Sequence, residues 1–104
     1  PDLKAIYGAN DELGMGAAQA VAAAGKTKDI VVTGLNGIPP AVAAVNRGFM
    51  DLTVSVSPFA FGNVGVDTMV SYLSGKGFGK KVLVGHVLVD KNNAKKFIRK
   101  KKKK

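Results

Sequence analysis

The chain has 104 residues, of which 46% are hydrophobic and 22% charged, a size and composition that suit one compact domain rather than two. The formal net charge is +9, but residues 95–104 hold 8 of the 16 basic residues and no acidic one, so residues 1–94 carry only 8 minus 7, or +1. Without Cys, and with His86 as the single His, the sequence excludes disulfides, thiolate nucleophiles, Cys-bound zinc and metal sites built from several histidines.

We expect neither a membrane span nor a signal peptide. No stretch reaches the roughly 20 apolar residues that a span needs, and the first residues lack the basic region and apolar core of a signal peptide. The sequence opens with Pro1 and its first Met is Met15, so we also expect processing or trimming of a longer product.

The first elements in the chain are a predicted strand and helix. Residues 3–8 form a short apolar run that ends at a Gly, which indicates a strand. Residues 13–24 are rich in Ala and indicate a helix, with Gly25 where a C-terminal cap is expected. The residues expected on its inner face are Leu13, Ala17, Val21 and Ala24.

A second strand and helix follow. Residues 30–34 are apolar and mostly β-branched, which is typical of a parallel strand covered on both faces. Pro39 and Pro40 can open a helix that ends at Gly48. Its expected inner residues are Ala41, Val42, Ala44 and Val45.

Residues 52–57 alternate between apolar and polar side chains, as a half-buried strand does, and residues 58–73 predict a third helix. Residues 81–89 predict a strand with a bend or bulge at Gly85, and residues 92–98 a short final helix. This alternation predicts an α/β fold, with an open, mainly parallel sheet and flanking helices.

In such sheets, ligands bind outside the carboxyl ends of the strands. The loops there are residues 8–11, 34–40 and 56–59, and their polar side chains are Asn10, Asp11, Asn36, Ser55 and Ser57. The amides of Asn10 and Asn36 both donate and accept hydrogen bonds, so they suit the hydroxyl groups of sugars and polyols. The alternative is structural, with Asn10 capping the following helix and Asn36 supporting a turn before Gly37.

Other motifs do not support catalysis. Gly14 and Gly16 begin a dinucleotide-binding pattern, but Gln19 occupies its third small position, so we interpret these glycines as helix-packing residues. His86 has no neighbouring Ser or Cys nucleophile, and the acidic residues are scattered. We therefore predict a protein that is not an enzyme and that uses no metal and no cofactor.

The basic end could hold polyanions non-specifically, but only Phe97 accompanies it as an aromatic residue. We interpret it as a solvated or non-native tail and predict no specific nucleic-acid partner.

Three segments carry a family resemblance: PDLKAIYGANDELGMGAAQAVAAAGK, DIVVTGLNGIPPAVAAVNRGFMDLTVSVSPFAFG and SYLSGKGFGKKVLVGHVLVDKNN. They resemble the C-terminal part of type I periplasmic sugar-binding proteins, the ribose-binding-protein-like solute receptors of ABC importers. The resemblance implies part of a type I periplasmic-binding-protein fold. Residues 1–56 would be the second half of the C-terminal lobe, residues 57–94 the helix and strand that return to the N-terminal lobe and cross back, and residues 95–104 a basic tail.

The resemblance also implies a solute site. Asn10 matches the family's cleft Asn, Asn36 stands where sugar binders usually have Asp, and Val56 stands at a hinge-side position often held by Gln. An Asn in place of Asp loses a charge-assisted hydrogen bond, and a Val removes a polar contact. The resemblance therefore implies another pentose, a hexose, a polyol or a less polar solute rather than ribose.

By the same resemblance, the partners are a sugar or polyol and a membrane permease, and the location is periplasmic, or extracellular and lipid-anchored in a Gram-positive source. Without the missing lobe, Phe61, Met69 and Leu73 would be exposed, which predicts self-association, a partner or a rearranged fold. Two alternatives stay open: the effector-binding domain of a lactose-repressor-family regulator, and a stand-alone half-domain that self-associates.

Overall fold

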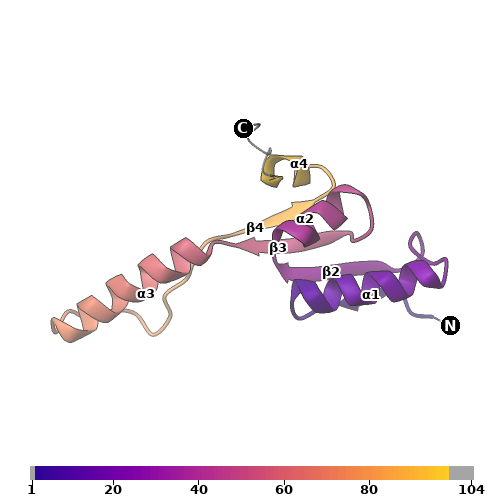
Figure 1. Ribbon diagram of the computed structural model, residues 1–104. Coiled ribbons are helices and arrows are strands. Elements are labelled where there is room, and N and C mark those ends of the chain that lie inside the picture. Colours follow the sequence, from indigo (N-terminus) through magenta and orange to yellow (C-terminus); the bar gives the residue numbers. More distant parts are fainter. Residues whose placement is uncertain (1, 99–104) are drawn as a thin grey trace, which may run out of the picture. The chain divides into compact units, whose positions relative to one another are not determined.

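The computed structural model describes residues 2–98, and strands and helices alternate along them (Figure 1). The elements are β1 (Ala5–Tyr7), α1 (Asp11–Ala23), β2 (Val31–Asn36), α2 (Pro39–Asn46), β3 (Leu52–Val56), α3 (Pro58–Leu73), β4 (His86–Asp90) and α4 (Ala94–Phe97). The predicted order of elements and the α/β fold class are confirmed.

The four strands form one open sheet in the order β1-β2-β3-β4. β1 pairs in parallel with β2, and β2 pairs in parallel with β3. Figure 1 shows β4 running opposite to β3, so the sheet is mixed but mainly parallel. The register sets Gly34 of β2 beside Thr53 of β3, and Asn36 beside Ser55. Because the three parallel strands point the same way, their carboxyl ends meet at one edge.

The chain divides into two compact units, whereas its length predicted one domain. The first unit contains the described residues up to Ser55 and those from Leu88 onward, and the second contains Val56–Val87. The polypeptide therefore passes between the units twice, at the end of β3 and within β4.

The core of the first unit lies between its helices and one face of its sheet. α1 packs against β2 and α2, and α2 packs against α4. The buried apolar residues are Ala18, Val21, Val32, Ala41, Val42, Ala44, Val45, Met50, Val89 and Ala94. All four inner residues predicted for α2 are among them. The proline pair at the start of α2 and Gly48, whose φ is +75°, explain why its ends agree with the prediction.

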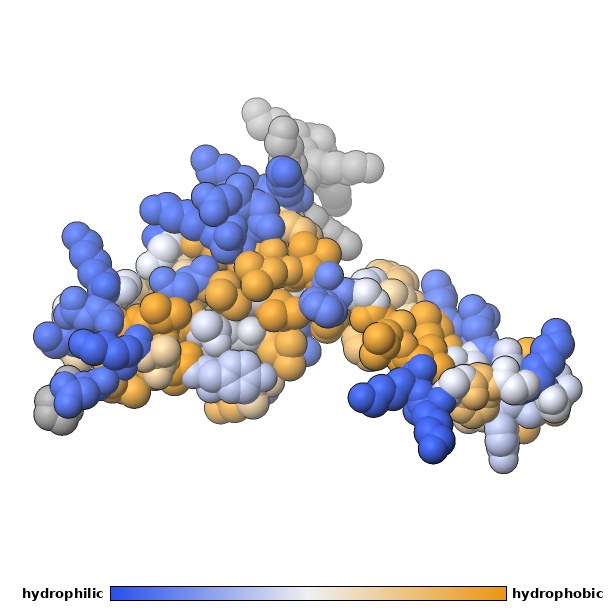
Figure 2. Space-filling view, turned by 180° about the vertical axis from the view of Figure 1, so that it is seen from behind, coloured by the Kyte–Doolittle hydropathy of each residue, from blue (hydrophilic) through white to orange (hydrophobic). Residues whose placement is uncertain are grey.

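The other face of the sheet is open within residues 2–98. Along β2, burial alternates: Val32 and Gly34 are buried, while Val31 is exposed. The expectation that this strand is covered on both faces is therefore wrong for the described residues. In β3 the one fully buried residue is Thr53, and the apolar Leu52 and Val54 are only partly buried. Figure 2, which views the molecule from behind, shows hydrophobic surface spread over this unit.

The buried face of α1 differs from the predicted one. Of the predicted inner residues, Val21 is buried, but Leu13 is 59% exposed and Ala24 is also exposed. Gly14 and Ala18 are buried instead. Gly14 explains the difference, because a Cβ there would lie only 2.9 Å from the carbonyl oxygen of Thr33. The helix approaches β2 through Gly14, so the large side chain of the neighbouring Leu13 is left exposed. Gly16 meets open space, so the packing role predicted for both glycines holds for Gly14 alone.

The second unit is built on α3, which has the predicted bounds. Pro58 opens it, and the Ser57 hydroxyl caps it by accepting a 3.2 Å hydrogen bond from the N–H of Ala60. The following strand was predicted from residue 81, but β4 begins only at His86, after Gly85. Within residues 2–98, no helix is both long enough and apolar enough to cross a bilayer.

Candidate functional site

The carboxyl ends of β1, β2 and β3 form the candidate site, and their residues up to Ser55 belong to the first unit. The N–H of Gly8 donates to the carbonyl oxygen of Thr33 at 2.9 Å, which continues the pairing of β1 and β2 beyond Tyr7. Asn36 is the last residue of β2 and lies beside Ser55 of β3. The loops that leave these strands therefore begin next to one another.

Asn10 caps α1. Its backbone is extended, with φ −147°, and its side-chain oxygen accepts a 2.8 Å hydrogen bond from the N–H of Leu13. The structural alternative for this residue is thus confirmed. It does not exclude binding, because the cap uses only the amide oxygen, and the side chain is partly exposed. The amide NH2 group remains a donor for a solute hydroxyl.

Asn36 has an unusual backbone. Its φ is +115°, and among the described residues it is the only non-glycine with a positive φ. Such a conformation costs about 1–3 kcal/mol and persists only where surrounding contacts enforce it. Its side chain is exposed, and Gly37 follows with φ +70°. The predicted turn is not found, because residues 37 and 38 form neither a turn nor a bend, and Asn36 ends β2 as an exposed residue at the carboxyl edge of the sheet.

A buried polar network lies beneath these two residues. Asp11 and Thr53 are both 0% exposed, and the Thr53 hydroxyl donates to Oδ1 of Asp11 at 2.6 Å. The N–H of Ile38 donates to Oδ2 of Asp11 at 2.8 Å, and the N–H of Gly37 donates to Oγ1 of Thr53 at 3.2 Å. One carboxylate thus joins the start of α1 to both β3 and the loop after β2.

Sequence reasoning named Asp11 as part of a polar loop but did not predict this network. The two side chains lie 42 residues apart, so no local pattern connects them. Two glycines make room for the network. A Cβ at Gly34 would meet Oδ1 of Asp11, and a Cβ at Gly37 would lie 2.5 Å from the Cβ of Ser55. The available signal was one glycine within a strand and one directly after it, followed by a polar residue on the next strand.

The structure brings two of the three predicted site residues together. Asn10 immediately precedes Asp11, and Asn36 lies two residues before Ile38, which is bonded to Asp11. Val56 ends β3, is partly buried, and is the first residue of the second unit. At this residue the chain first passes from one unit to the other.

The edge offers amide and backbone groups rather than catalytic ones. Within residues 2–98, no three His, Asp or Glu side chains gather as a metal site would require. His86 is exposed at the start of β4. Such an edge is suited to hydrogen-bonding a neutral polar molecule.

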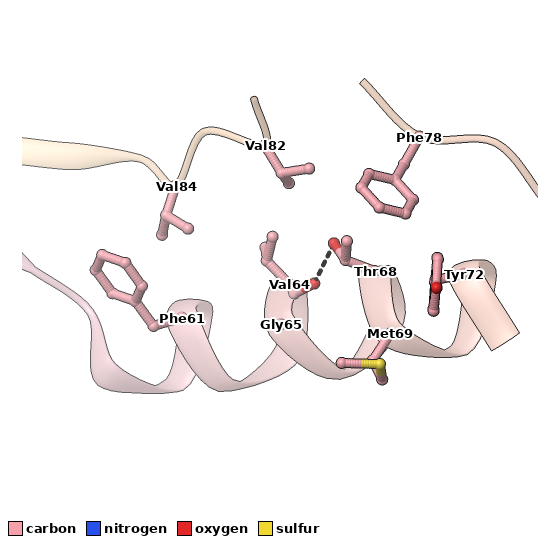
Figure 3. A pocket seen from close by; sticks show the side chains of 9 residues that line it. All are labelled: Phe61, Val64, Gly65, Thr68, Met69, Tyr72, Phe78, Val82 and Val84. Carbon is pink, nitrogen blue, oxygen red and sulfur yellow. Dashed lines mark hydrogen bonds between the residues drawn. The ribbon is translucent and has the colours of Figure 1, made fainter. Parts of the chain in front are cut away.

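The second unit carries an apolar groove of about 480 Å³ between α3 and the segment that leads to β4 (Figure 3). Its rim is aromatic at one end, where the rings of Tyr72 and Phe78 meet edge to face at 6.0 Å. The Thr68 hydroxyl donates to the carbonyl oxygen of Val64, so it offers no free donor to the groove. Phe61 and Met69 line it and remain 53% and 56% exposed. The predicted exposure of the α3 face is confirmed, including Leu73 at 74%.

An open α/β sheet whose polar residues gather at the carboxyl ends of its strands is an arrangement that ligand-binding proteins use. The comparisons with known proteins identify the family. A family model described as "Periplasmic binding protein domain" matches residues 1–77, so the chain belongs to the periplasmic binding protein family.

The chain is 50% identical over 70 residues to the D-allose-binding periplasmic protein of Escherichia coli K12, covering 67% of this chain and 22% of that protein. It is 37% identical over 91 residues to the ribose import binding protein RbsB of the same organism, covering 88% and 30%. A solved ABC transporter solute-binding protein from Mycobacterium smegmatis, with bound glycerol, superposes with a TM-score of 0.81 at 34% identity, covering 96% and 35%.

The chain spans less than a third of the length of these curated relatives. All three are binding proteins rather than enzymes by name. They favour the importer interpretation over the repressor alternative.

Proposed function

We propose that this chain is the C-terminal part of the sugar- or polyol-binding receptor of an ABC importer, and that the receptor is not an enzyme. The observation that carries the proposal is the pair of asparagines at the carboxyl edge of the sheet. Asn36 is held there in a strained backbone conformation, and the relatives of the chain bind D-allose, ribose or glycerol. An amide pair that donates and accepts matches the hydroxyl groups of such solutes.

We propose Asn10 and Asn36 as solute ligands, with Val56 on the hinge side of the site. Val56 adds apolar surface and no hydrogen bond, and the Asn36 amide is neutral. We infer a neutral hexose or polyol whose hydroxyl groups bond to the asparagines. D-allose is the first candidate, because the D-allose-binding relative has the highest identity among those described above.

We propose that residues 1–56 form the second half of the C-terminal lobe, that residues 57–94 return to the N-terminal lobe and cross back, and that residues 95–104 are a basic tail. The division of the described residues after Ser55 supports the first boundary, and the return to the first unit at Leu88 supports a segment that crosses back within residues 57–94. Residues 99–104 of the tail lie outside the described residues.

Two uncovered apolar surfaces support a larger receptor. One is the open face of the sheet, and the other is the groove along α3, whose unit has no buried residue on its helix. Exposed apolar surface of this kind is covered in a folded receptor by more of its own chain. For the chain alone, we propose self-association through the α3 groove instead.

As partners of the full receptor, we propose a membrane permease and no specific nucleic acid. For its location we propose the periplasm, or the outer surface of a Gram-positive cell through a lipid anchor. The full-length receptor here means the polypeptide in which this chain follows the N-terminal part that its relatives have.

The test is a thermal-shift screen of the full-length receptor against D-allose, D-ribose, glycerol and a panel of other sugars and polyols. A solute that binds only the folded protein raises its midpoint in a concentration-dependent way. We expect such a rise with at least one sugar or polyol, largest for a hexose or polyol rather than ribose. No rise across the panel would contradict the proposed function.

A further inference from the structure

The backbone at Asn36 and Gly37 has a conformation that is stabilised by contacts from other elements. Asn36 and Gly37 are two consecutive residues with positive φ, at +115° and +70°. A backbone in this region costs free energy, so neighbouring groups must enforce it. The groups that do so are not in the loop, because its N–H donors bond to side chains from other elements.

Two buried side chains supply those contacts. Oγ1 of Thr53 accepts from the N–H of Gly37, and Oδ2 of Asp11 accepts from the N–H of Ile38, at 3.2 and 2.8 Å. The two side chains also bond to each other at 2.6 Å. The backbone directly after Asn36 is therefore fixed at two successive amides, by residues of α1 and β3.

Neither side chain can reach a solute, because both are completely buried. Asn36 is exposed, and Asn10, the residue before Asp11, is partly exposed. The same carboxylate thus fixes the start of the helix that Asn10 caps and the loop that carries Asn36.

We propose that Asp11 and Thr53 are positioning residues: they set the distance and orientation between the two asparagines without touching the solute. This inference rests on the proposed function, since it concerns the same site. The Thr53 hydroxyl is the central element, because it donates to Asp11 and accepts from Gly37 at once.

The test compares variants of the full-length receptor in calorimetric titrations with D-allose and with D-ribose. Thr53→Val keeps the shape of the side chain but removes both hydrogen bonds, and we expect Kd to rise by about tenfold or more. Thr53→Ser restores the hydroxyl and is expected to stay within about threefold of the original Kd. Thr27→Val is the matched control, because Thr27 is exposed and far from this network in the chain, and no change is expected.

A second readout does not depend on the solute. Amide hydrogen exchange in the unliganded protein is expected to speed up at Gly37 and Ile38 in Thr53→Val, and to return toward normal in Thr53→Ser. The internal control is the amide of Arg47 at the end of α2, which donates to the carbonyl oxygen of Ala43. Its exchange rate is expected not to change. Should Thr53→Val fail to fold, Thr53→Cys carries the same predictions, because a thiol hydrogen-bonds only weakly.

An unchanged Kd in a folded Thr53→Val variant would overturn the proposal. So would equal losses in Thr53→Val and Thr53→Ser, since keeping the hydroxyl in Thr53→Ser would then make no difference to binding. If the unmodified receptor binds no sugar or polyol, the proposed function fails. The exchange rates at Gly37 and Ile38 then still decide whether the network positions the loop.

Discussion

The hydroxyl of Thr53 donates a 2.6 Å hydrogen bond to Oδ1 of Asp11, and both side chains are completely buried. The other carboxylate oxygen accepts from the N–H of Ile38. Every acceptor and donor of this pair is thus used within the fold, as buried polar groups require. The pair connects three elements at the edge where the candidate solute ligands lie.

Asp11→Ala is expected to lower the free energy of unfolding by about 2–4 kcal/mol, because it leaves a buried hydroxyl and a backbone N–H without their acceptor. Asp29→Ala is the control: Asp29 pairs with Lys26 at 3.4 Å, but both side chains are more than half exposed. That change is expected to cost less than about 0.5 kcal/mol. Urea unfolding of the full-length receptor measures both, and equal losses would contradict the assigned role of Asp11.

The sequence predicted where helices begin and end better than it predicted which of their faces are buried. Pro and Gly mark the ends of α2 and the start of α3, and those positions agree with the structure, because these residues act through local backbone chemistry. The inner face of α1 was predicted from hydrophobicity, and it is wrong at Leu13 and Ala24. Close approach to β2 is possible only at Gly14, and hydrophobicity does not register the need for a small residue.

The candidate site was likewise predicted only in part. The sequence predicted that polar residues gather after the strands, because strand ends in parallel sheets share an edge. It did not predict that Thr53, on the polar side of an alternating strand, is the buried one. Its burial depends on a carboxylate 42 residues away, and such a pairing exists only once the sheet register is set.

Replacing Asn36 separates its two roles. Asn36→Ala and Asn36→Gly both remove the amide, so both are expected to abolish solute binding in the full-length receptor, measured by calorimetry. Their stabilities are expected to differ: glycine adopts a φ of +115° freely, so Asn36→Gly should be about 1 kcal/mol more stable than Asn36→Ala. Unchanged affinity in either variant would remove Asn36 from the site.

Gly37 and Gly48 form a matched pair that tests how closely the loop after β2 packs against β3. Both have positive φ, +70° and +75°, but a Cβ at Gly37 would collide with Ser55, while one at Gly48 meets nothing within 4 Å. Gly48→Ala is expected to cost about 1 kcal/mol from backbone strain alone, and Gly37→Ala clearly more, about 3 kcal/mol or above. Equal costs in thermal unfolding would mean that the loop moves away from β3.

The apolar groove of α3 predicts self-association of the chain alone. We expect sedimentation velocity to detect dimers or larger species, and Met69→Lys to shift the population toward monomer, because Met69 lines the groove. Val66→Lys is the control: Val66 is also exposed on α3 but does not line the groove. A chain that stays monomeric before any substitution, or equal effects of the two lysines, would contradict association through this groove.

The most direct test of the account is a calorimetric titration of D-allose into the full-length receptor and into its Asn10→Ala/Asn36→Ala double variant. We expect saturable binding at one site in the receptor and no measurable binding in a double variant that still folds. Binding of equal strength in both proteins would contradict the assignment of the site to these two asparagines. If D-allose and the other sugars and polyols all fail to bind the unmodified receptor, the solute-binding function itself is wrong.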